Sequence, residues 1–242
     1  HPGFGYEDFV EGYRPDGTGF TLRPGVLRRL VAQAEAHPGQ PFVLVVDEIN
    51  RGDLPRTFGE LITLLEPGRR GELKVRLPLS GELLTLPPNL YLIGTMNSAD
   101  RSIVTLDAAL RRRFAFLELN PRPELLDEVA LGRVSLGDWL RALNRRLAEQ
   151  LGQEGRRLQL GHGYFLRQGR PLESLADIAD VVRDALWPLL QEYCDGEPAL
   201  LQAILGADGL YDAERGALRE ELFVPGREEE LTAALLAVVE QG

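Results

Sequence analysis

The sequence predicts an α/β domain built on a parallel sheet, followed by a domain made only of helices. Phe42–Val46 and Tyr91–Met96 are continuous apolar runs, which are typical of strands buried on both faces of a sheet. Phe114–Leu119 is a third such run, and segments with helical spacing alternate with these strands. Beyond the third run only helical periodicity remains. We therefore place the α/β domain at residues 1–121 and the helical domain at residues 122–242.

The elements of the first domain follow in order along the chain. Residues 1–25 are rich in glycine, proline and aromatic side chains, which predicts a long ordered loop. Apolar residues at helical spacing predict helices over Pro24–His37, Leu54–Leu65 and Thr105–Arg113. Between Gly71 and Pro88 apolar and polar residues alternate around a Ser-Gly turn, which predicts a β-hairpin.

The second domain shows helical periodicity alone. The predicted helices are Leu125–Leu131, Leu136–Leu151, Ile178–Leu190, Pro198–Leu205 and Leu231–Glu240. We find no internal repeat and no low-complexity tract in this part of the sequence.

Composition excludes several classes of protein. The 242 residues are 44% apolar and 26% charged, which suits a folded protein with a sizeable core. A net charge of -10 argues against a broad nucleic-acid-binding face. A single cysteine, Cys194, excludes internal disulfides and multi-cysteine zinc sites. The sequence has no apolar run of membrane-spanning length and no signal-peptide pattern, so we expect a cytoplasmic protein without a membrane contact.

The first functional signal is a pair of carboxylates, Asp47 and Glu48, directly after a predicted buried strand. Ligands of open α/β sheets gather at the carboxyl ends of the strands. One carboxylate there can hold Mg²⁺, directly or through water, and the other can polarise an attacking water molecule. The structural alternative is that both residues only close the following turn.

Two further signals are Asn97, at the end of the second strand, and the run Arg111-Arg112-Arg113. A neutral amide can orient a water molecule or bind a phosphate, although it can equally close a turn. An arginine can reach the nucleotide of a neighbouring subunit, although solvation or pairing with Asp107 is the simpler interpretation of this run.

Taken in order, these segments resemble an AAA+ nucleotide-hydrolysing module, with a Walker B segment, a sensor 1 asparagine and an arginine-finger region. Five segments add further detail: Tyr6–Phe9, Asp47–Arg51, Met96–Ser102, Gly161–Phe165 and Pro188–Tyr193. They are similar to segments of the McrB-type GTPases of modification-dependent restriction systems, with Ser98 replacing the usual threonine.

The resemblance implies a role for each polar group of the site. Asp47 would bind Mg²⁺, and Glu48 would activate the water molecule that attacks the nucleotide. Asn97 would position that water, while Asn50 and Asp100 would support the site as nucleotide-binding residues.

The resemblance also implies partners and a substrate. Arg112 and Arg113 would act in trans on the γ-phosphate of a neighbouring subunit in a ring, with a hexamer expected. GTP would be the substrate, and an McrC-like nuclease would be the partner. DNA would be contacted through regions outside this chain.

The sequence departs from the AAA+ pattern at the phosphate loop. The family sheet has the strand order 5-1-4-3-2, and the three predicted strands correspond to strands 3, 4 and 5. Strand 1 and its Gly-Lys-Ser/Thr loop have no counterpart, because the only lysine, Lys74, lies in the predicted hairpin. We therefore expect a partial AAA+ module followed by a helical lid domain, and we expect this fragment alone to be inactive.

Two rival functions remain open at this point. The first is an ATP-hydrolysing remodelling protein of the MoxR or dynein-related branch. The second is a non-catalytic ring subunit that donates only Arg112 and Arg113 to a partner.

Overall fold

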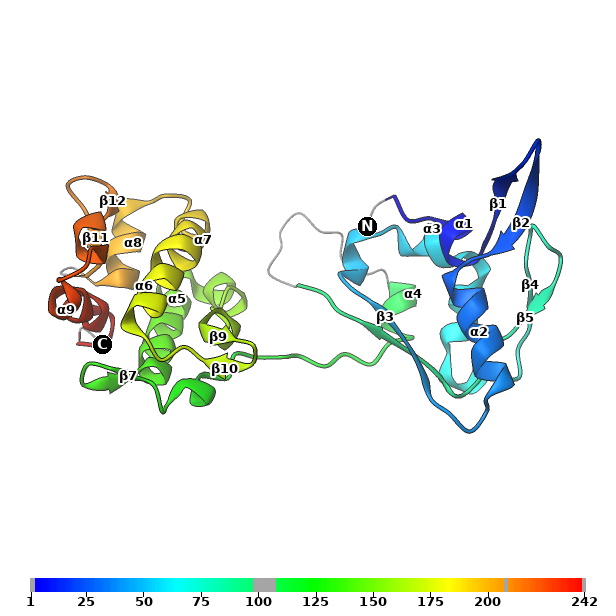
Figure 1. The fold of residues 1–242 in the computed structure, drawn as a ribbon, viewed down its shortest axis with the longest axis horizontal. Helices are drawn as coiled ribbons and strands as arrows, with labels where there is room; N and C mark the ends of the chain where they lie inside the picture. The colour runs from blue at the N-terminus through cyan, green and yellow to red at the C-terminus, as the bar shows by residue number, and fades with distance from the viewer. Residues whose placement is uncertain (1–2, 98–107, 207–208, 241–242) are drawn as a thin grey trace. The chain divides into compact units, whose positions relative to one another are not determined.

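The computed structural model describes residues 3–97, 108–206 and 209–240. The chain divides into two compact units, residues 1–117 and 118–242 (Figure 1). Each unit has its own hydrophobic core. The predicted fold class is confirmed: a parallel pair of strands lies in the first unit, and helices dominate the second. In the described ranges, no helix combines the length and apolar character that crossing a membrane requires.

The sheet of the first unit consists of β3 (Phe42–Val46) and β6 (Leu90–Gly94), paired in parallel. Both strands were predicted to be buried on both faces, and this is wrong for one face. Val43 and Val45 are 50% and 60% exposed, and their register partners Tyr91 and Ile93 are 51% and 52% exposed. Since side chains alternate along a strand, these four residues share one face, and only the opposite face packs on the core.

The predicted third strand, Phe114–Leu119, is not a strand in the structure. Phe116, Leu117 and Leu119 are exposed, two of them by more than 80%. A parallel strand needs a neighbour to accept and donate its backbone hydrogen bonds. In the family order the neighbour of strand 5 is strand 1, and among the described residues the sheet holds only β3 and β6.

The described residues of the first unit also form α-helices, α1 to α4. The predicted second helix begins as α3 but changes to a 3₁₀ helix over Gly59–Leu65, because Gly59 has a left-handed φ of 53°. Of the predicted helix 105–113, only α4 is described; residues before it lie outside the described ranges. The helices are α1 (Tyr6–Phe9), α2 (Val26–Ala36), α3 (Leu54–Phe58) and α4 (Ala108–Arg111).

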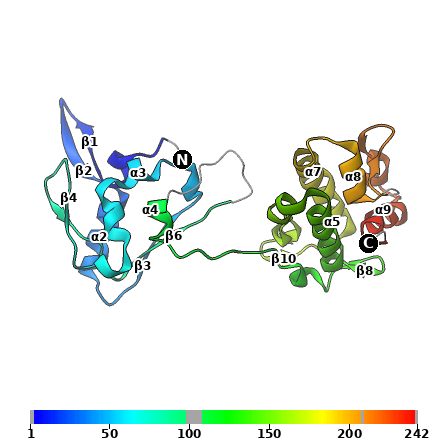
Figure 2. The same cartoon turned by 180° about the vertical axis from the view of Figure 1, so that it is seen from behind.

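Two hairpins lie at one end of the first unit (Figures 1 and 2). The predicted hairpin is present as β4 (Val75–Arg76) and β5 (Leu83–Leu84). The other, β1 (Glu11–Asp16) with β2 (Gly19–Pro24), replaces the loop predicted for residues 1–25. Its turn contains Gly17 at a φ of 60°, a conformation that glycine adopts without strain.

Glu11 joins the two hairpins through a fully buried carboxylate. Its Oε1 accepts hydrogen bonds from Leu79 N at 3.0 Å and Ser80 N at 2.9 Å, in the loop between β4 and β5. Its Oε2 accepts from Arg28 Nη1 at 2.6 Å, and Arg28 also pairs with Glu82. A single carboxylate therefore connects β1, α2 and the second hairpin.

The second unit is organised around α5, whose backbone breaks at Gly152. The helical segments follow the prediction closely, except that a π-helical turn over 182–186 lies between α6 and α7. The helices are α5 (Leu136–Arg157), α6 (Leu175–Val181), α7 (Trp187–Tyr193), α8 (Pro198–Leu205) and α9 (Glu228–Glu240).

Buried polar groups tie α5 to its neighbours. Arg146, only 5% exposed, donates from Nη1 to Ala203 O at 3.1 Å and from Nη2 to Ala237 O at 3.2 Å. Trp139 Nε1 donates to Leu235 O at 2.8 Å. These bonds satisfy backbone carbonyls of α8 and α9 that face α5.

The second unit is not made only of helices, which corrects the prediction. Three two-residue ladders interrupt it, and one of them takes the end of the predicted helix 125–131, which otherwise forms a 3₁₀ turn. These ladders are short antiparallel pairings closed by tight turns. Strands of two residues are too short to show the alternation of apolar and polar residues that predicts a strand. They are β7 (Ala130–Leu131) with β8 (Val134–Ser135), β9 (Leu166–Arg167) with β10 (Arg170–Pro171), and β11 (Tyr211–Asp212) with β12 (Ala217–Leu218).

Candidate functional site

The ends of β3 and β6 bring the acidic pair beside the neighbouring strand. The parallel pairing continues one residue past β6, where Thr95 N donates to Val46 O at 3.0 Å. Ile49 N then donates to Thr95 O at 2.8 Å. Asp47 and Glu48 therefore leave β3 next to Thr95, at the carboxyl edge of the sheet, where α/β folds hold their ligands.

The hydroxyl of Thr95 contacts both acidic residues. It donates a hydrogen bond to Asp47 Oδ1 and accepts one from the backbone N–H of Glu48 at 3.0 Å. All three residues are exposed, so these bonds are open to solvent in the described structure. One side chain, on the residue that follows β6, thus fixes the carboxylate of one acidic residue and the backbone of the other.

Glu48 has an unusual backbone. Its φ of 50° and ψ of 50° lie in the left-handed region, which non-glycine residues seldom occupy and which is concentrated at functional sites. Its carboxylate pairs with Arg51 Nε at 3.0 Å, and both side chains are about half exposed. An ion pair so exposed is weak, so Glu48 can exchange Arg51 for a water molecule at little cost in free energy.

The site offers oxygen ligands that suit Mg²⁺. The side-chain oxygen of Asn50, three residues after Asp47 in the sequence, is buried and has no hydrogen-bond partner among the described residues. A buried acceptor of this kind needs a donor such as a bound water molecule. Among the described residues no group of three or more His, Cys, Asp or Glu side chains could enclose a metal. One carboxylate plus water ligands fits Mg²⁺, which keeps several waters, better than zinc.

Asn97 lies two residues beyond Thr95 on the chain that leaves β6, and it is exposed. The paired register of β3 and β6 ends at Val46 and Gly94, three residues before Asn97. Asp100 lies outside the described residues.

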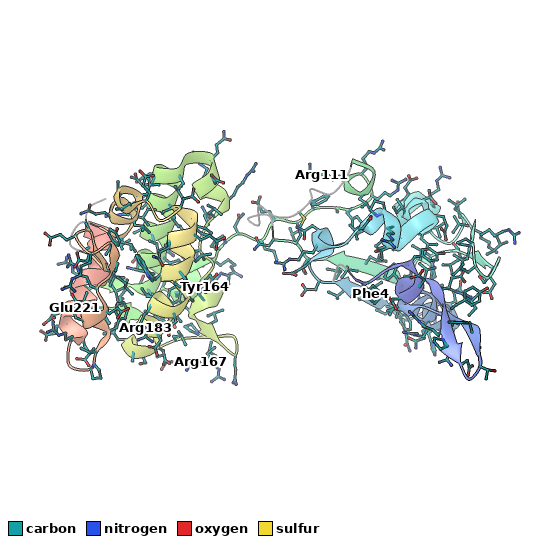
Figure 3. The ribbon with its side chains drawn as sticks, turned by 90° about the horizontal axis from the view of Figure 1, so that it is seen from above. Phe4, Arg111, Tyr164, Arg167, Arg183 and Glu221 are labelled. Atoms are coloured by element: carbon teal, nitrogen blue, oxygen red, sulfur yellow. The ribbon has the colours of Figure 1, made fainter. Side chains whose placement is uncertain are left out.

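The three consecutive arginines have different surroundings. Arg111, labelled in Figure 3, has its guanidinium carbon 5.9 Å from the ring centroid of Phe116. Arg112 is exposed. Arg113 is only 14% exposed, and its Nη2 lies 3.0 Å from Glu66 Oε1 of the same chain. The structure therefore separates Arg112 and Arg113, which the sequence interpretation treats as a pair.

Three residues of this region received no role from the sequence. Thr95 contacts both acidic residues, Arg51 pairs with Glu48, and Glu66 holds Arg113. A signal for Thr95 was present, since a hydroxyl residue follows the strand that neighbours the acidic strand. Glu66 gave no such signal, because its partner lies 47 positions away in the sequence.

Comparison with known families divides the chain where the structure does. Residues 1–114 match the AAA domain of the dynein-related subfamily. Residues 135–202 match the alpha-helical lid domain of McrB.

Two curated proteins are similar to the chain. The EcoKMcrB subunit of a type IV methyl-directed restriction enzyme, from Escherichia coli (strain K12), is 35% identical over 215 residues. The match covers 82% of this chain and 46% of that protein. Component YdiS of the type II restriction enzyme BsuMI, from Bacillus subtilis (strain 168), is 28% identical over 137 residues, 50% of this chain and 40% of that protein. The chain thus spans less than half the length of either relative.

Proposed function

We propose, from the premise that the chain belongs to the McrB-type AAA+ family, that it contributes to Mg²⁺-dependent hydrolysis of GTP in a restriction system. The observation that carries the proposal is the meeting of Asp47, Glu48 and Thr95 at the adjacent ends of two parallel strands. Hydrolysis would drive DNA translocation for a restriction endonuclease partner. Both curated relatives are named as parts of restriction enzymes, which supports this setting.

Each residue of the sheet edge has a role in the proposal. Asp47 binds Mg²⁺, which supplies charge neutralisation for the phosphates when it is bound. Glu48 accepts a proton from the attacking water molecule, and Asn97 orients that water. Asn50 and Asp100 support the site as nucleotide-binding residues. The exposure of Asp47 and Glu48 agrees with these roles, because both carboxylates can be reached by water.

The arginines act between subunits in the proposal. Arg112, which is exposed, reaches the γ-phosphate held by a neighbouring copy in a ring, which we propose to be a hexamer. Arg113 was assigned the same task from the sequence. Its ion pair with Glu66 favours a structural role instead. In this role Arg113 fixes the chain after α4, so that Arg112 can point toward the neighbouring subunit.

Phosphate binding requires a part that this sequence does not contain. No Gly-Lys-Ser or Gly-Lys-Thr loop occurs in the 242 residues. We propose that this loop, an McrC-like nuclease subunit and the DNA-contacting regions complete the active assembly. The 242 residues alone are then inactive.

The experiment uses the longest natural protein that contains this chain. Glu48→Gln should leave binding of GTP with Mg²⁺ within about twofold of the wild type and lower turnover at least a hundredfold, since it removes only the proton acceptor. Unchanged turnover in this variant would remove Glu48 from the mechanism. Binding would be measured with a fluorescent GTP analogue and turnover by phosphate release.

The choice between GTP and ATP is made by the same assay. The AAA match is to the dynein-related subfamily, which supports the ATP-hydrolysing alternative for the α/β unit. The lid match is to McrB, and it favours GTP. A higher kcat/KM for ATP than for GTP would replace the first proposal with the second. Hydrolysis of neither nucleotide by the folded protein would favour the non-catalytic ring subunit that donates only Arg112 and Arg113.

A further inference from the structure

We propose that Thr95 is a positioning residue of the hydrolytic site. Its hydroxyl orders the Asp47 carboxylate and the Glu48 backbone together, and so sets where the metal and the attacking water meet. This inference rests on the proposed function. It adds to the site a residue that follows β6, the strand paired with the strand that leads into Asp47 and Glu48.

The hydrogen bonds of Thr95 are directional. Its Oγ1 donates its only proton to Asp47 Oδ1, so its lone pairs remain to accept the Glu48 N–H at 3.0 Å. Asp47 then keeps its second carboxylate oxygen for a metal or its water. The hydroxyl thus fixes which oxygen of Asp47 stays available.

The same residue holds the bend at Glu48. Its carbonyl accepts Ile49 N at 2.8 Å and its amide donates to Val46 O at 3.0 Å, so the backbone of Thr95 pairs on both sides of the acidic pair. A left-handed backbone at a residue other than glycine is strained, and it persists only where neighbouring contacts determine it. The hydroxyl adds the bond to the Glu48 amide itself, between those two backbone bonds.

Substitutions of Thr95 can separate positioning from packing. Thr95 is exposed, so Thr95→Val removes the hydroxyl without opening a buried cavity. Thr95→Ser restores the hydroxyl and lacks only the methyl group. Thr21 supplies a matched control, because its exposed hydroxyl also donates to an aspartate, Asp16 Oδ2, at 3.1 Å.

The test combines kinetics with hydrogen exchange in the full-length protein. Thr95→Val should lower kcat about 10–100-fold, the effect typical of losing a residue that orients metal ligands, with KM for nucleotide within about twofold. Thr95→Ser should stay within about threefold of the wild type, and Thr21→Val should not change kcat. In the nucleotide-free protein, exchange of the Glu48 amide should be faster in Thr95→Val alone.

Several outcomes would overturn the role of Thr95. A Thr95→Val protein with wild-type kcat would do so, as would equal losses in Thr95→Val and Thr95→Ser. Unchanged exchange at Glu48 in Thr95→Val would show that the hydroxyl does not hold this amide. Failure of the proposed function looks different, because Glu48→Gln would then hydrolyse nucleotide as fast as the wild type.

Discussion

Arg113 Nη2 lies 3.0 Å from Glu66 Oε1, and this contact ties the end of α4 to the segment that follows the 3₁₀ helix 59–65. The neighbouring Arg112 is exposed. Two adjacent arginines therefore face different environments, one inside its own unit and one toward solvent.

We expect Arg112→Ala to lower turnover of the assembled protein at least a hundredfold, because loss of an arginine finger commonly costs 10³–10⁵ in rate. Arg111→Ala is the matched control and should stay within about twofold. Mixing Arg112→Ala subunits with Glu48→Gln subunits should restore part of the turnover, since some interfaces then combine an intact Glu48 with an intact Arg112. No recovery in the mixture would contradict action between subunits.

Glu11 gives a prediction for the dependence of stability on pH. Burial acts to raise the pKa of Glu11, but hydrogen bonds from Ser80 and Leu79 and the charge of Arg28 outweigh it, so the pKa lies below its ordinary value. A carboxylate with a lowered pKa stabilises the fold above the unfolded pKa of about 4.3, and this stabilisation is lost as pH falls through the folded pKa.

Glu11→Gln should therefore lower the free energy of unfolding by about 2 kcal/mol at pH 7, where a buried charged acceptor is lost. The difference from the wild type should shrink below about pH 4. Urea unfolding at several pH values measures it. A difference that stays constant from pH 7 to pH 3 would show that the charge of Glu11 contributes nothing.

Arg146 should matter for the stability of the helical unit. Arg146→Met would leave Ala203 O and Ala237 O without their donor, and we expect a loss of about 2–4 kcal/mol. Arg145→Met is the control, since Arg145 is exposed and adjacent in sequence, and its effect should stay within about 0.5 kcal/mol. Equal unfolding midpoints for the two variants would contradict the assigned role of Arg146.

The thiol of Cys194 should be inert in the folded protein. Burial, with smaller effects of Asp195 and Glu197, raises the pKa of Cys194 to about 11. At pH 8 only about one thiol in a thousand is then ionised, and the thiolate is the reactive form. Labelling by a chromogenic disulfide reagent should be slow in buffer and complete in denaturant. Labelling at the rate of a free cysteine in buffer would place Cys194 at the surface.

The sequence was informative wherever one segment determines its own structure. The β-branched run of β3 and the helical spacing of α2 and α5 predicted these elements, because local periodicity reflects which side chains are buried. The family assignment is likewise confirmed, since it rests on ordered local motifs.

Prediction failed for features whose structure depends on contact with another, distant segment of the chain. Phe114–Leu119 has the composition of a strand, but a strand also requires a pairing neighbour. The exposure of Val45 and Ile93 could not be predicted either, because an apolar run does not reveal whether other elements pack on one face of the sheet or on both. The bond between Thr95 and Asp47 depends on the register of two strands 48 positions apart.

The left-handed backbone of Glu48 has a consequence for the choice of inactive variants. Asparagine occupies this conformation more readily than glutamine or alanine does. Glu48→Asn should therefore unfold at a higher temperature than Glu48→Gln, although both lack the carboxylate. The protein then carries at position 48 a side chain that the local chain geometry disfavours, and it gives up thermal tolerance by holding a carboxylate there.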